Sequence, residues 1–113
     1  MAGQLKRLAG PAYLSASAAD IYTPSASTIY TVIRHIHLFN TDSSARTFSL
    51  YVGGTGGSTG GTELFKGYSI PANTPYDFYP VPGLKMISTD FLSGLASSGS
   101  TIVITVFGEL VVA

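Results

Sequence analysis

The only two histidines of the chain, His35 and His37, are separated by one residue in the stretch TVIRHIHLFN. This stretch is rich in β-branched and aromatic residues, which is typical of a β-strand. Alternate side chains of a strand point to the same side, so both imidazoles are expected on one face. Two imidazoles on one face are a common beginning of a metal site, which needs three or four ligands in total.

A third ligand is difficult to find at a useful spacing from the two histidines. A cupin-like metalloenzyme would carry a Glu four or five residues further on, where this chain has Thr41 and Asp42, and a third His downstream, which it lacks. Asp20, Asp42 or Asp90 could complete a site only if the tertiary structure brought one of them close. We therefore expect no metal and no cofactor, and we interpret His35 and His37 as surface or interface residues.

Other catalytic arrangements are equally weak. No G-x-S-x-G motif occurs, so a serine nucleophile on a strand-to-helix turn is not indicated. The carboxylates are scattered singly rather than paired as in a glycosidase. They are Asp20, Asp42, Glu63, Asp77, Asp90 and Glu109. We expect a protein that is not an enzyme.

The glycine-rich stretch GGTGGSTGG, residues 53–61, raises the question of phosphate binding. A P-loop needs Lys after its last glycine, but Thr62 follows Gly61 here. The dinucleotide-binding fingerprint needs a strand before it and a helix after it, whereas this stretch has strand-like segments on both sides. The stretch therefore predicts a flexible hairpin loop that joins two strands of one sheet.

Composition limits the classes of function further. The chain has 113 residues, enough for one domain with one core. Only 11% of residues are charged and the net charge is zero, so there is no basic field to attract nucleic acid. A charge-poor surface is weakly protected against self-association, which favours a homo-oligomer. The absence of cysteine excludes disulfides and thiolate chemistry.

The first twenty residues imitate a signal peptide, because Lys6 and Arg7 precede a mildly apolar stretch. Pro11 and Ser15 interrupt that stretch, which favours a retained segment. No apolar run is long enough to span a bilayer, so we expect no membrane partner. We interpret residues 1–19 as an N-terminal arm, in which 4–8 is the only short stretch that could be helical.

The rest of the chain reads as strands separated by turns. In residues 29–39 apolar side chains fall on both faces, which indicates a strand covered on both sides. The segment 101–112 is the strongest strand, and Gly108 within it indicates a bulge or a close backbone contact. The predicted strands cover 30–39, 47–52, 63–70, 76–79, 84–88, 90–95 and 101–112. The side chains expected in the core are Phe48, Leu50, Ile102, Ile104 and Val106.

Strands at intervals of about ten residues, with turn signals between them and no helical period, predict an all-β fold. We expect a single antiparallel β-sandwich, jelly-roll-like, over residues 20–113, preceded by the arm of residues 1–19.

Most of the chain, from about residue 20 to residue 112, resembles small structural proteins of tailed bacteriophages. The resemblance is a pattern of strands and turns, without a catalytic signature. The matching pieces are Ile21-Tyr22-Thr23-Pro24, Ile33-Arg34-His35-Ile36-His37 with Asn40, Ser49-Leu50-Tyr51-Val52-Gly53-Gly54, Ile70-Pro71-Ala72-Asn73 with Asp77, and Thr105-Val106-Phe107-Gly108-Glu109.

The resemblance implies a virion component without enzymatic activity. Its first implication is a capsid decoration (cement) protein, often a trimer, which is assembled in the host cytoplasm and binds the major capsid protein on the outer surface of the head. A small tail or fibre subunit is the alternative within this class. A carbohydrate-binding β-sandwich is the alternative from another class, and it would use exposed aromatic side chains such as Tyr76, Phe78 and Tyr79.

The arm offers the most obvious contact residues for a partner. Apolar anchors and two cations could pack on a neighbouring subunit or on the capsid, the cations through charge-assisted bonds to acidic groups. Deleting residues 1–19 is then expected to leave the sandwich folded but to weaken particle binding. The candidate interface residues are Leu5, Lys6, Arg7, Leu8, Tyr13, Leu14, His35 and His37.

Overall fold

The computed structural model describes residues 4–54, 56–58 and 60–112, and at Gln4 and Leu5 it describes the backbone alone. Every regular element in these residues is a β-strand. The described residues therefore contain no helix that is long and apolar enough to cross a membrane. The strands are β1 (Gln4–Tyr13), β2 (Ala19–Tyr22), β3 (Thr28–Asn40), β4 (Arg46–Gly53), β5 (Glu63–Ile70), β6 (Pro75–Phe78), β7 (Leu84–Met86), β8 (Phe91–Ala96) and β9 (Ile102–Val112).

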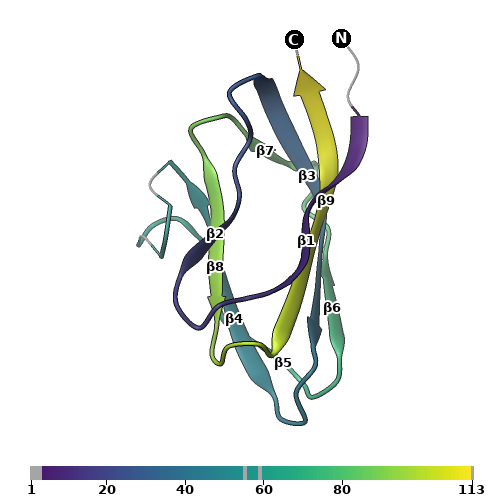
Figure 1. Ribbon diagram of the computed structural model, residues 1–113, viewed down its shortest axis with the longest axis vertical. Coiled ribbons are helices and arrows are strands. Elements are labelled where there is room, and N and C mark those ends of the chain that lie inside the picture. Colours follow the sequence, from purple (N-terminus) through teal and green to yellow (C-terminus); the bar gives the residue numbers. More distant parts are fainter. Residues whose placement is uncertain (1–3, 55, 59, 113) are drawn as a thin grey trace.

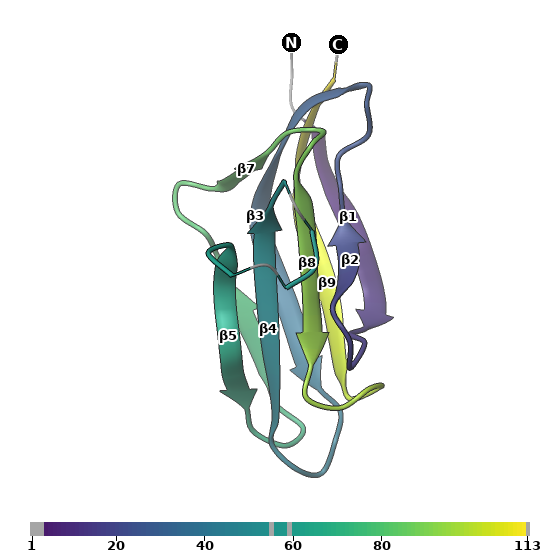
Figure 2. The same cartoon turned by 90° about the vertical axis from the view of Figure 1, so that its left-hand side faces the viewer.

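The strands form two antiparallel sheets that face each other (Figures 1 and 2). One sheet has the order β1-β9-β3-β6, with β7 also paired to β3, and the other has the order β2-β8-β4-β5. Successive strands mostly alternate between the two sheets, which is the strand order of a jelly roll. The predicted all-β, jelly-roll-like sandwich is therefore confirmed.

The core fills the space between the sheets. Phe48, Leu50, Ile102, Ile104 and Val106 are each 2% exposed or less, so the predicted inward set of β4 and β9 is correct. β3 contributes Ile33, Ile36 and Leu38 to the same core, and each of them is fully buried.

An aromatic cluster closes one side of the sandwich, where β5 of one sheet lies near β6 of the other. Neighbouring rings have centroids 4.6 to 6.1 Å apart, within the range of tilted and edge-to-face packing. The rings belong to Phe48, Phe65, Tyr68, Tyr76 and Phe78. Tyr76 and Phe78 thus point inward from β6, which leaves the intervening Asp77 on the outer side.

A β-bulge at Arg34 explains why β3 carries apolar side chains at both odd-numbered and even-numbered positions. Ile33 is paired with Gly108 and His35 with Phe107, so β3 has one residue more than β9 between these pairs. Because of the extra residue, odd-numbered side chains point inward before the bulge and even-numbered side chains point inward after it. Ile33 points inward before the bulge and Ile36 after it, so the strand has one buried face throughout. The apolar side chains of both parities in β3 therefore result from the bulge, and not from a second layer that covers the outer side of the strand.

Gly108 lies opposite the bulge, and its backbone approaches β3 closely. A Cβ atom at this position would clash with the carbonyl oxygen of Val32 and lie 2.9 Å from the side chain of Leu8. The predicted close backbone contact at Gly108 is therefore confirmed. Only glycine allows β9 to pack against the bulged strand here.

The segment expected to be an arm is part of the sandwich over its described length. β1 pairs with β9 from Gln4 to Tyr13, and the amide of Leu14 donates a hydrogen bond of 2.8 Å to the carbonyl oxygen of Ile102. The expectation of an arm outside the sandwich is wrong for residues 4–13, and the stretch 4–8, the only one that could have been helical, is part of β1. The strand pairing supplies hydrogen bonds that sequence patterning in this Ala- and Gly-containing segment did not reveal.

The glycine-rich stretch joins β4 and β5, which pair with each other, so the predicted hairpin is confirmed. Its described part turns back over the same sheet, where the buried hydroxyl of Ser93 on β8 donates a hydrogen bond of 2.6 Å to the carbonyl oxygen of Gly57. Thr55 and Thr59 lie outside the described residues.

Candidate functional site

The two histidines lie on the outward side of the β1-β9-β3-β6 sheet, because they follow the bulge at Arg34. β6 is the neighbour of β3 on this stretch, and Asp77 is the residue directly opposite His37. Opposed residues on adjacent strands have Cβ atoms about 4.5–5.5 Å apart, and diagonal ones remain within reach of long side chains. Strand pairing therefore brings a carboxylate next to both imidazoles.

The three side chains make direct contacts. Nε2 of His35 lies 2.7 Å from Oδ1 of Asp77, and Nδ1 of His37 lies 2.6 Å from the same oxygen. Hydrogen bonds to His37, and after it to His35, hold the pKa of the Asp77 carboxyl below its ordinary value. The carboxylate is thus ionised at neutral pH and accepts from both rings, which requires a proton on each contacting nitrogen.

Aromatic rings hold His35 in place. Its imidazole stacks on Tyr79 with a centroid distance of 4.4 Å and an interplanar angle of 9°, and on Phe107 at 5.4 Å and 16°. These rings come from the residue after β6 and from β9. We call the surface formed by His35, His37, Asp77, Tyr79 and Phe107 the outer sheet face.

The segment after β6 borders the outer sheet face and exposes apolar side chains. Tyr79 is 61% exposed and Val81 is 91% exposed. Arg34 holds this segment to the sheet, since its guanidinium donates to the carbonyl oxygen of Pro82 and pairs with Glu109 at 2.7 Å. A large apolar side chain as exposed as Val81 gains nothing from the fold of its own chain.

The third side chain that a metal site would need therefore lies next to the two histidines. The reason for expecting no metal was that no acidic group stood at a useful spacing, and Asp77 overturns that reason. The acidic residues considered as alternatives do not join the histidines. Asp42 pairs with Arg46 at 2.6 Å, Asp90 accepts a hydrogen bond from the amide of Ile87, and Asp20 lies in β2 of the opposite sheet.

A partial signal for Asp77 exists in the sequence. Tyr76-Asp77-Phe78 alternates apolar, acidic and apolar residues, so a strand over it must place Asp77 on the face opposite to the two rings. What local patterning does not contain is the pairing of this strand with the one that carries the histidines. That pairing spans 40 residues of sequence between His37 and Asp77.

The remaining candidate interface residues are distributed differently from the expectation. Leu14 is 3% exposed and belongs to the core of its own chain, and Leu8 packs against that core. Lys6, Arg7 and Tyr13 are exposed on β1. The side chain of Leu5 lies outside the described residues. Leu8 and Leu14 are therefore not free to anchor the chain to a partner.

The aromatic side chains proposed for sugar binding do not form one exposed platform. Tyr76 and Phe78 point into the aromatic cluster, and burial raises the pKa of the Tyr76 hydroxyl. Of the three, Tyr79 alone is largely exposed, and it is stacked on His35.

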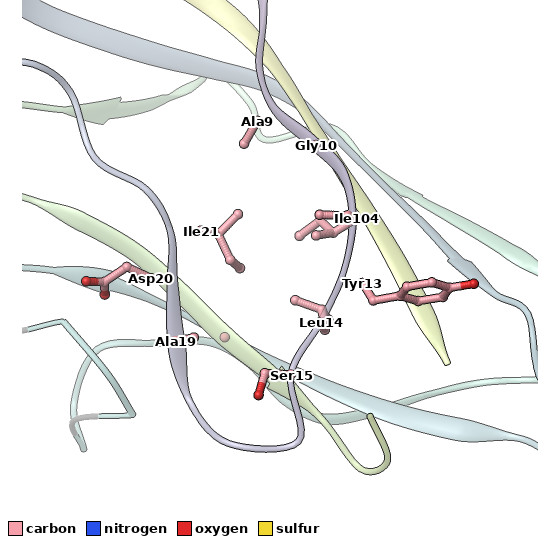
Figure 3. Close-up of a pocket in the computed structure, with 11 residues that line it drawn as sticks. Ala9, Gly10, Tyr13, Leu14, Ser15, Ala19, Asp20, Ile21 and Ile104 are labelled. Carbon is pink, nitrogen blue, oxygen red and sulfur yellow. The ribbon is translucent and has the colours of Figure 1, made fainter. Parts of the chain in front are cut away.

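A small cavity lies at the opposite side of the sandwich, between β1 and β2 (Figure 3). Its volume is about 160 Å³, and side chains including Leu14, Ile21 and Ile104 line it together with the backbone of Gly10. Sites for small-molecule ligands usually measure about 300 Å³ or more. Asp20 is the single carboxylate in its lining, so the cavity offers no pair of carboxylates.

Comparison with known protein families, with curated proteins and with solved structures finds no match to this chain.

Proposed function

We propose that this protein is a non-enzymatic structural subunit of a bacteriophage virion, and that it decorates the outer surface of the capsid. The pattern of strands and turns that resembles small phage structural proteins supports this proposal. The jelly-roll strand order is compatible with it, because jelly rolls are frequent in viral capsid proteins and also in lectins. A fold alone does not assign a function, so the proposal rests on the side chains at the surface.

The observation that carries the proposal is the apolar character of the surface around the outer sheet face. Val81 is 91% exposed and Tyr79 is 61% exposed, and they stand two residues apart in the segment after β6. Exposed apolar side chains close together favour contact with another protein. Aromatic residues are also enriched at the centres of protein interfaces. Contact with the major capsid protein, and between copies of this chain, would cover them.

The proposed mechanism is adhesion without chemistry. A subunit that binds only the assembled shell stabilises that shell by mass action, because it has no affinity for the dissociated state. Many copies on one particle make a modest affinity per copy sufficient when the copies are linked to one another. A neutral, charge-poor chain suits this role, since few charges have to be desolvated at the contact.

The test is to locate the chain in virions of the phage that encodes it. Mass spectrometry of purified particles should detect it in many copies, and a cryo-EM reconstruction should show it on the outside of the head. Density at the tail or at a fibre would support the alternative virion subunit. Absence of the chain from purified particles would refute both.

A binding assay then tests the surface. Heads that lack the subunit are mixed with the wild-type protein or with a Val81→Asp variant, which places a charge in the proposed contact. Ile29→Asp is the matched control, because Ile29 is 47% exposed at the start of β3. We expect Val81→Asp to lose binding while Ile29→Asp retains it. If Val81→Asp binds the heads as well as the wild type and Ile29→Asp do, the segment after β6 is not part of the contact.

The carbohydrate-binding alternative has one supporting observation, the exposed ring of Tyr79. A sugar ring could stack on it, as sugars do on aromatic faces in binding modules. A glycan array probed with the purified protein distinguishes the two functions. Specific binding to one glycan, lost in Tyr79→Ala, would favour recognition of sugars over capsid decoration.

A further inference from the structure

We propose that His35, His37 and Asp77 form a binding site for one divalent transition-metal ion. The proposal does not depend on a role in the virion, because it concerns only what these three side chains bind. One ligand atom from each side chain lies within 4.8 Å of the other two. In a metal site these atoms surround a common point, and here both ring nitrogens already converge on one carboxylate oxygen.

The donor set fits Zn²⁺ well. Two imidazole nitrogens with one carboxylate oxygen are a ligand combination that zinc uses in sites with three protein ligands and an open fourth position. Bond lengths of about 2.0–2.2 Å place tetrahedral ligands roughly 3.3 Å apart. The present separations of 2.6 and 2.7 Å are those of hydrogen bonds, so the carboxylate must move back by about 0.6 Å to admit the ion.

Two features make that adjustment small. Asp77 lies at the sheet edge on β6, and its side chain is 38% exposed, so nothing buried has to move with it. The His35 ring is held between Tyr79 and Phe107, which fixes the direction of its Nε2 atom. A ring that is already held in one orientation loses less motion when it binds an ion.

The electrostatics favour a cation as well. An aspartate carboxylate carries a negative charge at neutral pH, because its ordinary pKa is about 3.9. Without a metal, the two ring N–H groups neutralise part of that charge through hydrogen bonds. A metal ion replaces both protons at the same position, because imidazole and carboxylate must be deprotonated at the coordinating atoms.

The site is open to solution on one side. The side chains of His35 and His37 are 25% and 37% exposed, so further coordination positions of the ion face outward. Water or a donor from another molecule would fill them. The arrangement is therefore that of a surface metal site rather than of an enclosed structural one.

The test uses the full chain, treated with a chelator and then titrated with Zn²⁺ by isothermal calorimetry. We expect one Zn²⁺ per chain, and an affinity at least about tenfold lower in Asp77→Asn and in His37→Gln. Glu109→Gln is the matched control, because it removes a carboxylate from the same sheet without removing a ligand, and its affinity should stay within about twofold. Thermal unfolding without metal establishes that each variant is folded.

NMR of the wild-type protein gives a second measurement, which does not depend on whether a variant folds. The chain has two histidines only, so their ring signals in an NMR spectrum belong to this site. Both sets of ring signals should shift together on addition of one equivalent of Zn²⁺. Unchanged ring signals at about 1 mM Zn²⁺, where any Kd below the millimolar range gives substantial occupancy, would overturn the proposal. Equal affinity in wild type and in Asp77→Asn would overturn it too, because the bound ion would then be adventitious.

Discussion

Asn40 shows how much one buried polar residue organises in this protein. It is fully buried at the end of β3, where its side-chain amide donates to the carbonyl oxygens of Ser44 and Ile70. Its side-chain oxygen accepts from the amide of Asp42. A buried amide whose donors and acceptor are all used fixes the surrounding backbone, because any other geometry leaves polar groups unsatisfied. Asn40 thereby sets the turn that leads from β3 into β4.

The ion pair of that turn gives a prediction about pH. The hydrogen bond from Arg46, followed by that from the amide of Ser43, lowers the pKa of Asp42 below 3.8. A carboxylate with a lowered pKa in the folded state adds stability above its unfolded pKa, and this stability is lost as the pH falls through the lower folded value. At pH 7 the wild type should therefore be more stable than Asp42→Asn.

Urea denaturation at several pH values measures this effect. The difference in unfolding free energy between wild type and Asp42→Asn should be constant from pH 7 to about pH 5 and should shrink below the ordinary pKa of Asp. A difference that persists unchanged at pH 2 would mean that the carboxylate charge is not its source.

Ile104 tests the core at the same scale. It is 2% exposed and lies between Leu38 on β3 and Ala12 on β1 in the sheet. Ile104→Ala should lower the free energy of unfolding by about 2–5 kcal/mol, through lost apolar contacts and the void that remains. The control is Ile29→Ala at a side chain that is 47% exposed, where the change should stay within about 0.5 kcal/mol. Similar losses in both variants would show that the assigned register is wrong.

At the scale of elements, the strands with alternating or β-branched sequences were predictable. The strands that form only because a neighbouring strand pairs with them were not. The stretch 47–52 alternates apolar and polar residues, and β4 covers it. β1 contains Gly10 and Pro11, which disfavour a strand locally, and it forms because β9 offers an open edge. β2 has four residues, too few for a periodic pattern to emerge from the sequence.

The candidate site shows the same division. The shared face of His35 and His37 follows from strand period alone. Asp77 could not be assigned to them, because the pairing of β3 with β6 depends on the whole sheet. The bulge at Arg34 was likewise hidden, since its effect on the apolar pattern resembles that of a strand covered on both faces.

β1 carries a prediction of its own. Deleting residues 1–13 should destabilise the protein strongly, because it removes the strand paired along β9 and uncovers the cavity side of the core. The exposed edge of β9 should also promote aggregation. Thermal unfolding and size-exclusion chromatography measure both effects.

A synthetic peptide with the sequence of residues 4–14 is the complementary experiment. Added to the truncated protein, it should raise the unfolding temperature by occupying the vacant edge. A truncated protein that stays monomeric with an unchanged unfolding temperature would argue that β1 adds nothing to the fold, as the arm interpretation expected.

At the scale of the whole molecule, neutrality and exposed apolar side chains act together. The formal net charge is zero and the pI is about 6.7, so copies of the chain repel one another little at neutral pH. Val81→Lys adds one charge to the segment after β6. It should shift self-association to higher concentration, because the lysine must be desolvated in any contact made there.

Analytical ultracentrifugation of the wild type, Val81→Lys and a Ser88→Lys control measures that shift. Ser88 is exposed in the turn after β7, so the control adds the same charge elsewhere. If the control weakens association as much as Val81→Lys does, net charge rather than the apolar contact governs it.

The adjacency of β1 and β9 has a consequence for how the protein is made. Among the described strands β1 is translated first and β9 last, so the sheet that they share cannot be completed until β9 has been made. At roughly 5–20 residues per second, several seconds pass between the synthesis of β1 and that of β9. Throughout that interval the hydrogen-bonding groups of β1 lack their final partner. We expect nascent chains stalled before β9 to be held by chaperones, and closure of the sandwich to follow the synthesis of β9.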